Sequence, residues 1–320
     1  MSDQSMPHGR GAIFNAFSRE RFGMAGLILL LAAILMAVFA PVLAPYDPYA
    51  PVADISIDDI YAPPSSEHLL GTDDAGKDVL SNFIYGARVS LVVGFFASFI
   101  SIVIGGTVGL SSGYLGGRTD NILMRITDFM LVIPDLPLIV VLVALTKPSL
   151  MNIIIVIGIL GWTSSARLVR SQTLSVKQRK FVMRARAIGA GDRYIVRKHI
   201  FPLVLPLIVV NTVLVISLSI LNESALSFLG LSDPTLISWG QMLNFAFTRG
   251  AMSAGAWWAL IPPGFGIVWV VLACTLLGHG LEQVLNPRVA WHHLSDRRDM
   301  VAVPAHEAVS PESLPQEAVR

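Results

Sequence analysis

The stretch RLVRSQTLSVKQRKFVMRARAIGAGDRYIVRK, residues 167–198, carries ten lysines or arginines and a single acid, Asp192. It separates two uncharged apolar runs, residues 148–166 and 199–222. Each run approaches or exceeds the ~20 residues with which a helix crosses a bilayer. A basic loop between two such runs is typical of the cytoplasmic face of a membrane protein.

The composition of the whole chain predicts an all-α membrane protein. Hydrophobic residues make up 53% of the sequence and charged residues 14%, and the mean hydropathy is +0.64, far from the usage of soluble domains. A further segment, 121–146, is interrupted by Arg125, Asp128 and Asp135, and we count it as a span because its second half is uncharged. The six predicted spans are 22–46, 89–117, 121–146, 148–166, 199–222 and 250–281.

The distribution of basic residues predicts that both termini are cytoplasmic. With six spans in this orientation, 19 lysines or arginines face the cytoplasm and 4 face outward, which satisfies the positive-inside rule. Residues 47–78 hold eight acids and one base, as expected of an outer segment. We therefore divide the chain into a cytoplasmic tail (1–21), a transmembrane domain (22–290) and a disordered cytoplasmic tail (291–320). Within the domain, the outer loop covers about 47–88 and the cytoplasmic loop about 167–198.

Few residues of this sequence suit catalysis, metal binding or nucleotide binding. Cys274 is the only cysteine, and no catalytic motif with a defined spacing is present. Residues 71–77 have the Gly-x4-Gly-Lys spacing of a phosphate-binding loop, but Asp78 replaces the Ser or Thr that would bind magnesium. We therefore expect no catalytic residue, metal, cofactor or nucleic acid on this chain, and any ATP would be hydrolysed by a partner.

Polar residues inside predicted spans are the better functional candidates, because each costs several kcal/mol in a bilayer unless it is paired or faces water. They line a transport pathway or form hydrogen bonds between helices. The candidates are Arg125, Asp128, Asp135, Asn211, Glu223 and His279.

The basic loop contains the pattern of a short docking helix. Phe181, Ala185 and Ile188 recur at helical spacing and are predicted to share one face. Small residues follow, and Gly189 with Gly191 is expected to end the helix. A polybasic segment that only holds anionic lipid is the alternative interpretation. Another face of the helix is predicted to carry Lys177, Lys180 and Arg184.

The residues from Arg184 to Ala190, followed by His199-Ile-Phe-Pro202, resemble the cytoplasmic EAA loop of ABC import permeases. Ala185 and Gly189 match that pattern, whereas Met183 and Arg184 stand in place of its Glu-Ala. Other segments narrow the resemblance to the C-type permease subunits of dipeptide, oligopeptide and nickel importers. In chain order they are HLLGTD (68–73), GKD (76–78), YGARVS (85–90), GYLGG (113–117), MR (124–125) with Asp128, Trp162, ARLVR (166–170), LSFLG (226–230) and WG (239–240).

This resemblance implies the six-helix fold of type I importers, in a bacterial inner membrane. It also implies a second, B-type permease, two cytosolic ATPase subunits that bind ATP and Mg, and an extracytoplasmic substrate-binding protein. The EAA-like loop would be the coupling helix that docks on the ATPase, and we expect Arg186 and Asp192 to pair with ATPase charges. The residues assigned to coupling are Ala185, Arg186, Ala187, Ile188, Gly189, Ala190 and Asp192.

Two alternatives remain open from the sequence. A gradient-driven carrier or channel would use Asp128, Asp135 and Glu223 as ion or proton sites and would need no ATPase. The substrate is also open, since the binding protein selects it in such importers. Peptides come first, and nickel chelates, glutathione-like molecules and opine-like compounds are the other candidates.

Overall fold

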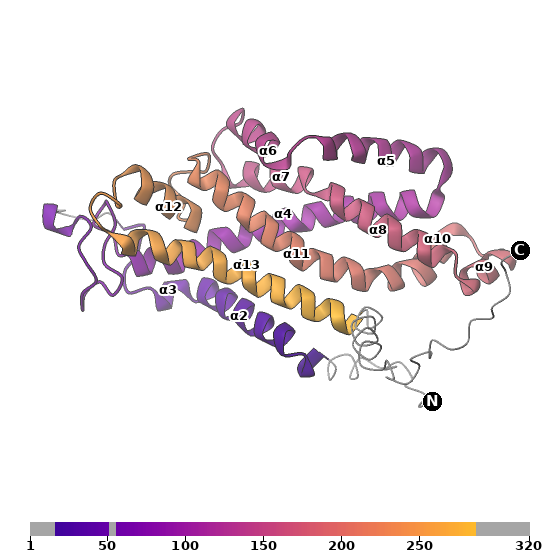
Figure 1. Cartoon of the computed structure of the whole chain (residues 1–320), viewed down its shortest axis with the longest axis horizontal. Helices are drawn as coiled ribbons and strands as arrows, with labels where there is room; N and C mark the ends of the chain where they lie inside the picture. Colours follow the sequence, from indigo (N-terminus) through magenta and orange to yellow (C-terminus); the bar gives the residue numbers. More distant parts are fainter. Residues whose placement is uncertain (1–16, 51–55, 286–320) are drawn as a thin grey trace, which may run out of the picture.

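The computed structural model describes residues 17–50 and 56–285, and these residues form a bundle of long helices (Figure 1). Within these ranges there is no β-strand beyond one isolated bridge, between Thr72 and Asp78. The all-α prediction is confirmed. Residues 1–16 of the predicted N-terminal tail and the whole predicted C-terminal tail, 291–320, lie outside the described residues.

Five helical segments are long and apolar enough to cross a membrane. Their large apolar side chains remain exposed on the outside of the bundle, as a lipid-facing surface requires and a soluble one rarely shows. The segments are α2 (Arg21–Val38), α4 (Val79–Leu115), α7 with α8 (Leu150–Leu160 and Trp162–Lys177), α11 (Phe201–Phe228) with the short helical turns that precede it from Asp192, and α13 (Trp257–Leu285).

The sixth predicted span is divided into two helices. Helix α5 (Gly117–Val132) and helix α6 (Asp135–Ala144) meet at an angle of 83°. Pro134 follows Ile133, whose extended backbone (ψ 126°) ends α5, because the proline ring disfavours helical geometry in the preceding residue. The bundle therefore has six spans if the bent pair counts as one.

Several helix boundaries differ from the predicted spans because helices continue past charged residues. Helix α4 begins at Val79 rather than residue 89, since the side chain of Asp78 caps it and Arg88 lies within it. Helix α8 likewise continues past Arg167 and Arg170 to Lys177, whereas α13 begins later than predicted, at Trp257, because residues 249–255 form turns. The remaining short elements are α3 (Ala40–Leu43), a 3₁₀ turn (Ile57–Asp59), α9 (Lys180–Ala187), α10 (Asp192–Ile195), a π-helical turn (Val196–Ile200) and α12 (Trp239–Thr248).

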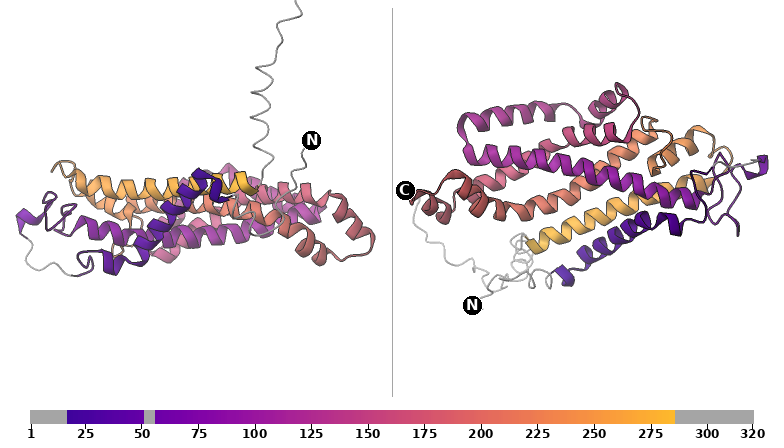
Figure 2. Two further views of the ribbon diagram at one scale, coloured as in Figure 1. Left: turned by 90° about the horizontal axis from the view of Figure 1, so that it is seen from below. Right: turned by 180° about the vertical axis from the view of Figure 1, so that it is seen from behind.

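The basic loop and the acidic 47–78 segment lie at opposite ends of the bundle. Figure 1 shows α9 and α10 at one end, and α12 with the described parts of the 47–78 segment at the other. The two further views in Figure 2 show the same separation. Helix α2 packs against α13, and α4 packs against α7, α8 and α11.

Helices α4 and α8 approach closely along a seam of glycines. Gly105, Gly109 and Gly113 recur every four residues on α4, and the α8 backbone passes beside each. A Cβ placed on Gly105 would lie 2.6 Å from the carbonyl oxygen of Trp162, and one on Gly109 would lie 2.5 Å from that of Ala166. Small residues at this spacing are a common means of packing membrane helices, because they let two backbones meet.

We expect Gly109→Ala to loosen this seam and Gly106→Ala to have little effect. The added methyl at 109 meets backbone, and overpacking of this kind costs about 1–3 kcal/mol. A Cβ at Gly106, three residues earlier in the same helix, meets no atom within 4 Å. Thermal unfolding in detergent should therefore show a lower Tm for Gly109→Ala alone. Equal Tm values for the two variants would contradict the close approach.

Candidate coupling loop and buried polar sites

The basic loop ends α9 with a defined glycine turn. Gly189 has φ +85°, its N–H donates to the carbonyl of Arg186 (3.0 Å), and the N–H of Ala190 donates to that of Ala185 (3.1 Å). These two bonds form a Schellman motif, in which a left-handed glycine ends the helix. The predicted role of Gly189 as a helix terminator is confirmed. The turn leaves the side chain of Ile188 86% exposed at the end of the bundle.

The predicted faces of the docking helix are wrong in one respect. Val182 and Ala185 are the buried residues of α9, and they belong to a core cluster that also includes Tyr114 and Ile195. Phe181 and Ile188, predicted to share the face of Ala185, are exposed. The predicted apolar stripe and the pair Val182 and Ala185 both have helical spacing, so spacing alone does not decide which of them is buried. Packing of α9 against α8 and α10 buries Val182 and Ala185.

Tyr114, in the last turn of α4, joins the loop to the bundle. Its hydroxyl donates to Oδ1 of Asp192 (2.5 Å), and the cationic groups of Arg186 and Lys177 each lie 5.7 Å from the centre of its ring. The Tyr114 side chain is buried. Two of the predicted coupling residues, Arg186 and Asp192, thus contact the end of a spanning helix.

Five of the seven predicted coupling residues are exposed at the tip of the loop. Ala185 is buried beneath it and Ala190 is half-buried. The exposed members are Arg186, Ala187, Ile188, Gly189 and Asp192.

An ion pair that the sequence did not predict joins the first part of the basic loop to α5. The guanidinium of Arg170 in α8 binds both carboxylate oxygens of Asp120 in α5, at 2.6 and 2.7 Å. The hydroxyl of Ser112 in α4 also contacts Asp120. This bidentate contact fixes the start of α5 to the two helices of the glycine seam.

Glu223 is a buried carboxylate at the opposite end of the bundle. It is 1% exposed and accepts hydrogen bonds from the hydroxyls of Ser90 (3.2 Å), Ser224 (3.3 Å) and Ser227 (2.7 Å). The Ser238 hydroxyl, just before α12, also reaches this carboxylate. Glu223 therefore connects α11 to α4 and to the start of α12.

Trp239 reinforces the same junction between α4 and α12. Its indole N–H donates to the carbonyl of Phe83 (2.9 Å), and its side chain is fully buried. A Cβ on the neighbouring Gly240 would lie 2.5 Å from the carbonyl oxygen of Ser224. The Trp-Gly pair in the sequence thus serves helix packing.

The other candidate polar residues are dispersed over the bundle. Asn211 donates to the hydroxyl of Ser165 (2.7 Å), which links α11 to α8, and exposed Asp128 pairs with Arg167 (2.6 Å). Exposed His279 lies 3.9 Å from Glu282. Arg125 and Asp135 are exposed. Among the described residues, no group of three or more His, Cys, Asp or Glu side chains is placed to hold a metal ion.

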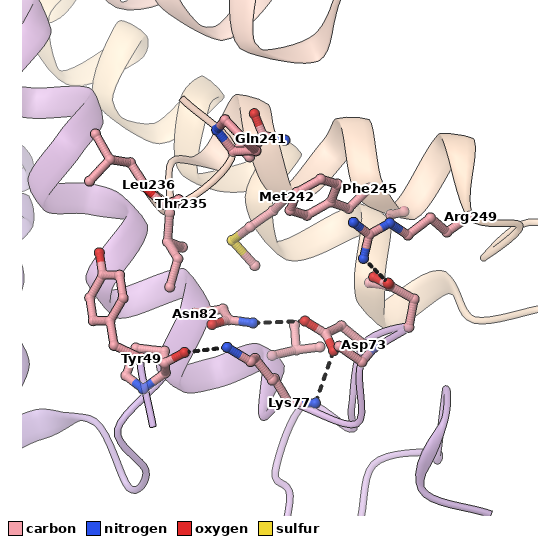
Figure 3. Close-up of a pocket in the computed structure, with 18 of the residues that line it drawn as sticks. Tyr49, Asp73, Lys77, Asn82, Thr235, Leu236, Gln241, Met242, Phe245 and Arg249 are labelled. Atoms are coloured by element: carbon pink, nitrogen blue, oxygen red, sulfur yellow. Dashed lines mark hydrogen bonds and ion pairs between the residues drawn. The ribbon is translucent and has the colours of Figure 1, made fainter. Parts of the chain in front are cut away.

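A pocket of about 380 Å³ opens beside α12, at the end of the bundle that carries the 47–78 segment (Figure 3). Its walls include Tyr49, Met242 and Phe245, and its polar groups include Asp73 and Asn82. Burial is the main cause that raises the pKa of the Asp73 carboxyl above its usual value, and hydrogen bonds from backbone N–H groups partly oppose it. No pattern in the sequence indicated this pocket.

The segment that resembles a phosphate-binding loop forms part of this pocket. Gly71 and Gly76 both have positive φ, at 66° and 68°. The N–H groups of Ala75 and Lys77 donate to Oδ1 of Asp73, at 2.9 Å each. A side-chain carboxylate of the loop itself therefore occupies these two N–H groups, which a phosphate would otherwise use.

Comparison with known families covers most of the chain. Residues 101–291 match the family model of the binding-protein-dependent transport system inner membrane component. Residues 11–64 match the N-terminal TM domain of oligopeptide transport permease C. The two matches follow each other along the chain without overlap.

Three relatives are similar to the chain over most of its length. The dipeptide transport system permease protein DppC of Bacillus subtilis is 38% identical, over 85% of this chain and 83% of the relative. The oligopeptide transport system permease protein OppC of the same organism is 36% identical, over 85% and 88%. The glutathione transport system permease protein GsiD of Escherichia coli O6:K15:H31 is 38% identical, over 85% and 88%.

A solved structure supports the fold. A chain from inward-facing MetNI, a methionine ABC transporter, superposes with a TM-score of 0.52 at 19% identity, covering 64% of this chain and 95% of that chain. The fold is that of an ABC importer permease in a multi-pass inner-membrane protein. Since relatives above 30% identity cover more than two thirds of the sequence, the chain belongs to the family of inner membrane components of binding-protein-dependent transport systems.

Proposed function

We propose that this chain is one of two different permease subunits of an ATP-driven importer of peptides or peptide-like molecules. The observation that carries the proposal is the similarity to permeases named for dipeptide, oligopeptide and glutathione transport over most of the chain. Peptides and glutathione share the peptide bond, which favours this substrate class over nickel chelates or opines. The B-type partner permease, two ATPase subunits and a substrate-binding protein complete the assembly.

The basic loop is proposed to couple this chain to an ATPase subunit. Ile188 offers an exposed apolar side chain at the tip, beside a glycine turn that leaves room for a partner. Behind the tip, Val182 and Ala185 anchor α9 in the core, and Tyr114 joins Asp192 to α4. A push on the tip is thus transmitted to a spanning helix instead of being absorbed by a flexible loop.

In the proposed transport cycle, the ATP-bound ATPases bind one of two conformations of the permease bundle more tightly than the other. Closure of the ATPases on ATP and Mg would favour one position of α9, and the bundle would shift between inward-open and outward-open arrangements. This chain would contribute no catalytic group, because ATP binding and hydrolysis take place on the partners. The hydroxyl of Tyr114 occupies one oxygen of Asp192, so a cation of the ATPase would approach the other.

Replacing Gly189 with tryptophan should break the contact with the ATPase. A Cβ at Gly189 meets no atom of this chain within 4 Å, so the added bulk would meet only a partner. Gly255, at the opposite end of the bundle, is a matched control with φ +69° and equally open space. Affinity purification of the tagged chain from native membranes should recover a second permease and ATPase subunits from wild type and Gly255→Trp. The Gly189→Trp variant should lose the ATPase subunits, and undiminished recovery would refute this coupling surface.

The orientation of the loop can be tested with cysteine labelling. Cys274 is fully buried, so the wild-type chain should react little with an impermeant maleimide. Ile188→Cys should be labelled in inside-out vesicles only, and Met252→Cys, exposed at the other end, in right-side-out vesicles only. The reverse pattern would place the loop outside and rule out ATPase coupling.

Glu223 variants separate the importer from a gradient-driven carrier. If Glu223 serves packing, Glu223→Gln should keep ATP-driven uptake, because an amide can still hydrogen-bond to the surrounding serines. Glu223→Leu should lower the Tm, since each buried hydroxyl left without a partner costs about 1–3 kcal/mol. Uptake in proteoliposomes and thermal unfolding measure the two effects. A stable Glu223→Gln variant without transport would show that the charge itself is needed, as the carrier alternative requires.

A further inference from the structure

The pocket beside α12 has two polar side chains at its base, the carboxylate of Asp73 and the buried amide of Asn82. The side-chain N–H₂ of Asn82 donates to Oδ2 of Asp73 (3.0 Å). The Asn82 oxygen, Oδ1, points the other way in Figure 3, is removed from solvent and has no hydrogen-bond partner among the described residues. Asn82 is only 5% exposed, so this oxygen cannot turn to bulk water. Because this oxygen is closed off from solvent, only the N–H₂ group of Asn82 acts at the base of the pocket, where it orients the Asp73 carboxylate.

The carboxylate of Asp73 lacks a counter-ion in contact with it. Within the described residues its hydrogen bonds come from the N–H groups of Ala75 and Lys77 and from the Asn82 amide. The ammonium group of Lys77 donates instead to the carbonyl of Pro48 (2.7 Å), and Arg249 pairs with the neighbouring Asp74. Both nearby cations are therefore engaged elsewhere, and the raised pKa of Asp73 reflects its burial.

Above these polar groups the pocket is apolar and aromatic. Its walls include Met242, Phe245, Leu236 and the rings of Tyr49 and Tyr61. The volume of about 380 Å³ is within the range of small-molecule sites, which combine apolar walls with a few polar groups. A ligand that fits carries a hydrogen-bond donor at one end and an apolar body at the other.

We propose that this pocket binds the protonated amine of a small molecule with an apolar body, such as the amino-terminal residue of a short peptide. The ammonium group would donate to the Asp73 carboxylate, which the Asn82 amide holds in place. The apolar body would lie against Met242 and Phe245. The assignment of the pocket to the extracytoplasmic side rests on the proposed function. The amine-binding chemistry rests only on the contacts described above.

Photo-crosslinking of the full-length chain in nanodiscs, with any subunits that co-purify, tests the site. The probe is leucinamide with a diazirine in its side chain, and its N-acetyl derivative is the uncharged control. We expect the amine probe to label pocket residues such as Met242 and Phe245. The N-acetyl probe should label them about tenfold less, since an ammonium–carboxylate bond is a strong, charge-assisted one.

Two threonine variants control for blockage of the pocket. Thr235→Trp should fill the mouth and abolish labelling, because exposed Thr235 lines the pocket. Thr248→Trp, on the exposed surface of α12 outside the pocket, should leave labelling unchanged. The two variants are matched because each removes one hydrogen bond that the threonine hydroxyl makes to a nearby residue. Asn82→Leu, which leaves the pocket mouth open, should also reduce labelling, because the Asp73 carboxylate loses the hydrogen bond from the Asn82 amide.

Three results would overturn the proposal. The first is equal labelling by the amine and N-acetyl probes, and the second is labelling that Thr235→Trp does not reduce. The third is complete loss of labelling when ligand-free binding protein is added, which would assign the pocket to a protein contact. Recovery of ATPase subunits with Thr235→Trp reports on the proposed function separately, so the two ideas can fail independently.

Discussion

The close approach of α4 and α8 is the constraint on which the rest of the structure depends. Gly105, Gly109 and Gly113 let the α8 backbone lie directly on α4, and the hydrophobic effect offers no driving force for this contact inside a bilayer. Dispersion contacts between backbones replace it. At one end of this seam Arg170 extends from α8 to Asp120, so the start of α5 is positioned by the same two helices.

The polar network around Glu223 organises the other end of the bundle. A buried carboxylate is stable there only because serine hydroxyls from α4 and α11, and from the residue before α12, converge on it. The Trp239 indole then joins α12 to the carbonyl of Phe83. Helix α12 is thereby held against α4, and the pocket beside it exists because the 47–78 segment packs onto the same two helices.

Sequence patterns predicted the spans because charge and hydropathy are local properties of a segment. They also predicted the glycine turn at Gly189, since its conformation depends on a single residue. The buried face of α9 was predicted wrongly, because Phe181 and Val182 begin equally plausible stripes and only the neighbouring helices choose between them. The bend at Pro134 separates two helices that hydropathy alone would join.

Two of the contacts that the sequence did not predict join distant residues. Tyr114 and Asp192, and Asp120 and Arg170, become partners only when the bundle closes. Asn82 and Asp73 lie close in the sequence, but their contact depends on the turn that leads into α4. The single-residue signals that were available, such as an aromatic residue at a helix end or an Asn in the first turn, are common in helices without functional sites. Their meaning depends on the partner that the fold supplies.

Helix α4 connects the two proposed sites mechanically. It is one unbroken helix of 37 residues without proline, so at 1.5 Å per residue it is about 55 Å long. Its first turn carries Asn82 at the base of the pocket, and its last turn carries Tyr114 at the coupling loop. Because the α8 backbone packs along it, α4 resists bending, and a displacement at the Tyr114 end tilts or shifts the whole rod. Movement of the coupling loop would therefore change the pocket through one rigid element, without a chain of separate side-chain rearrangements.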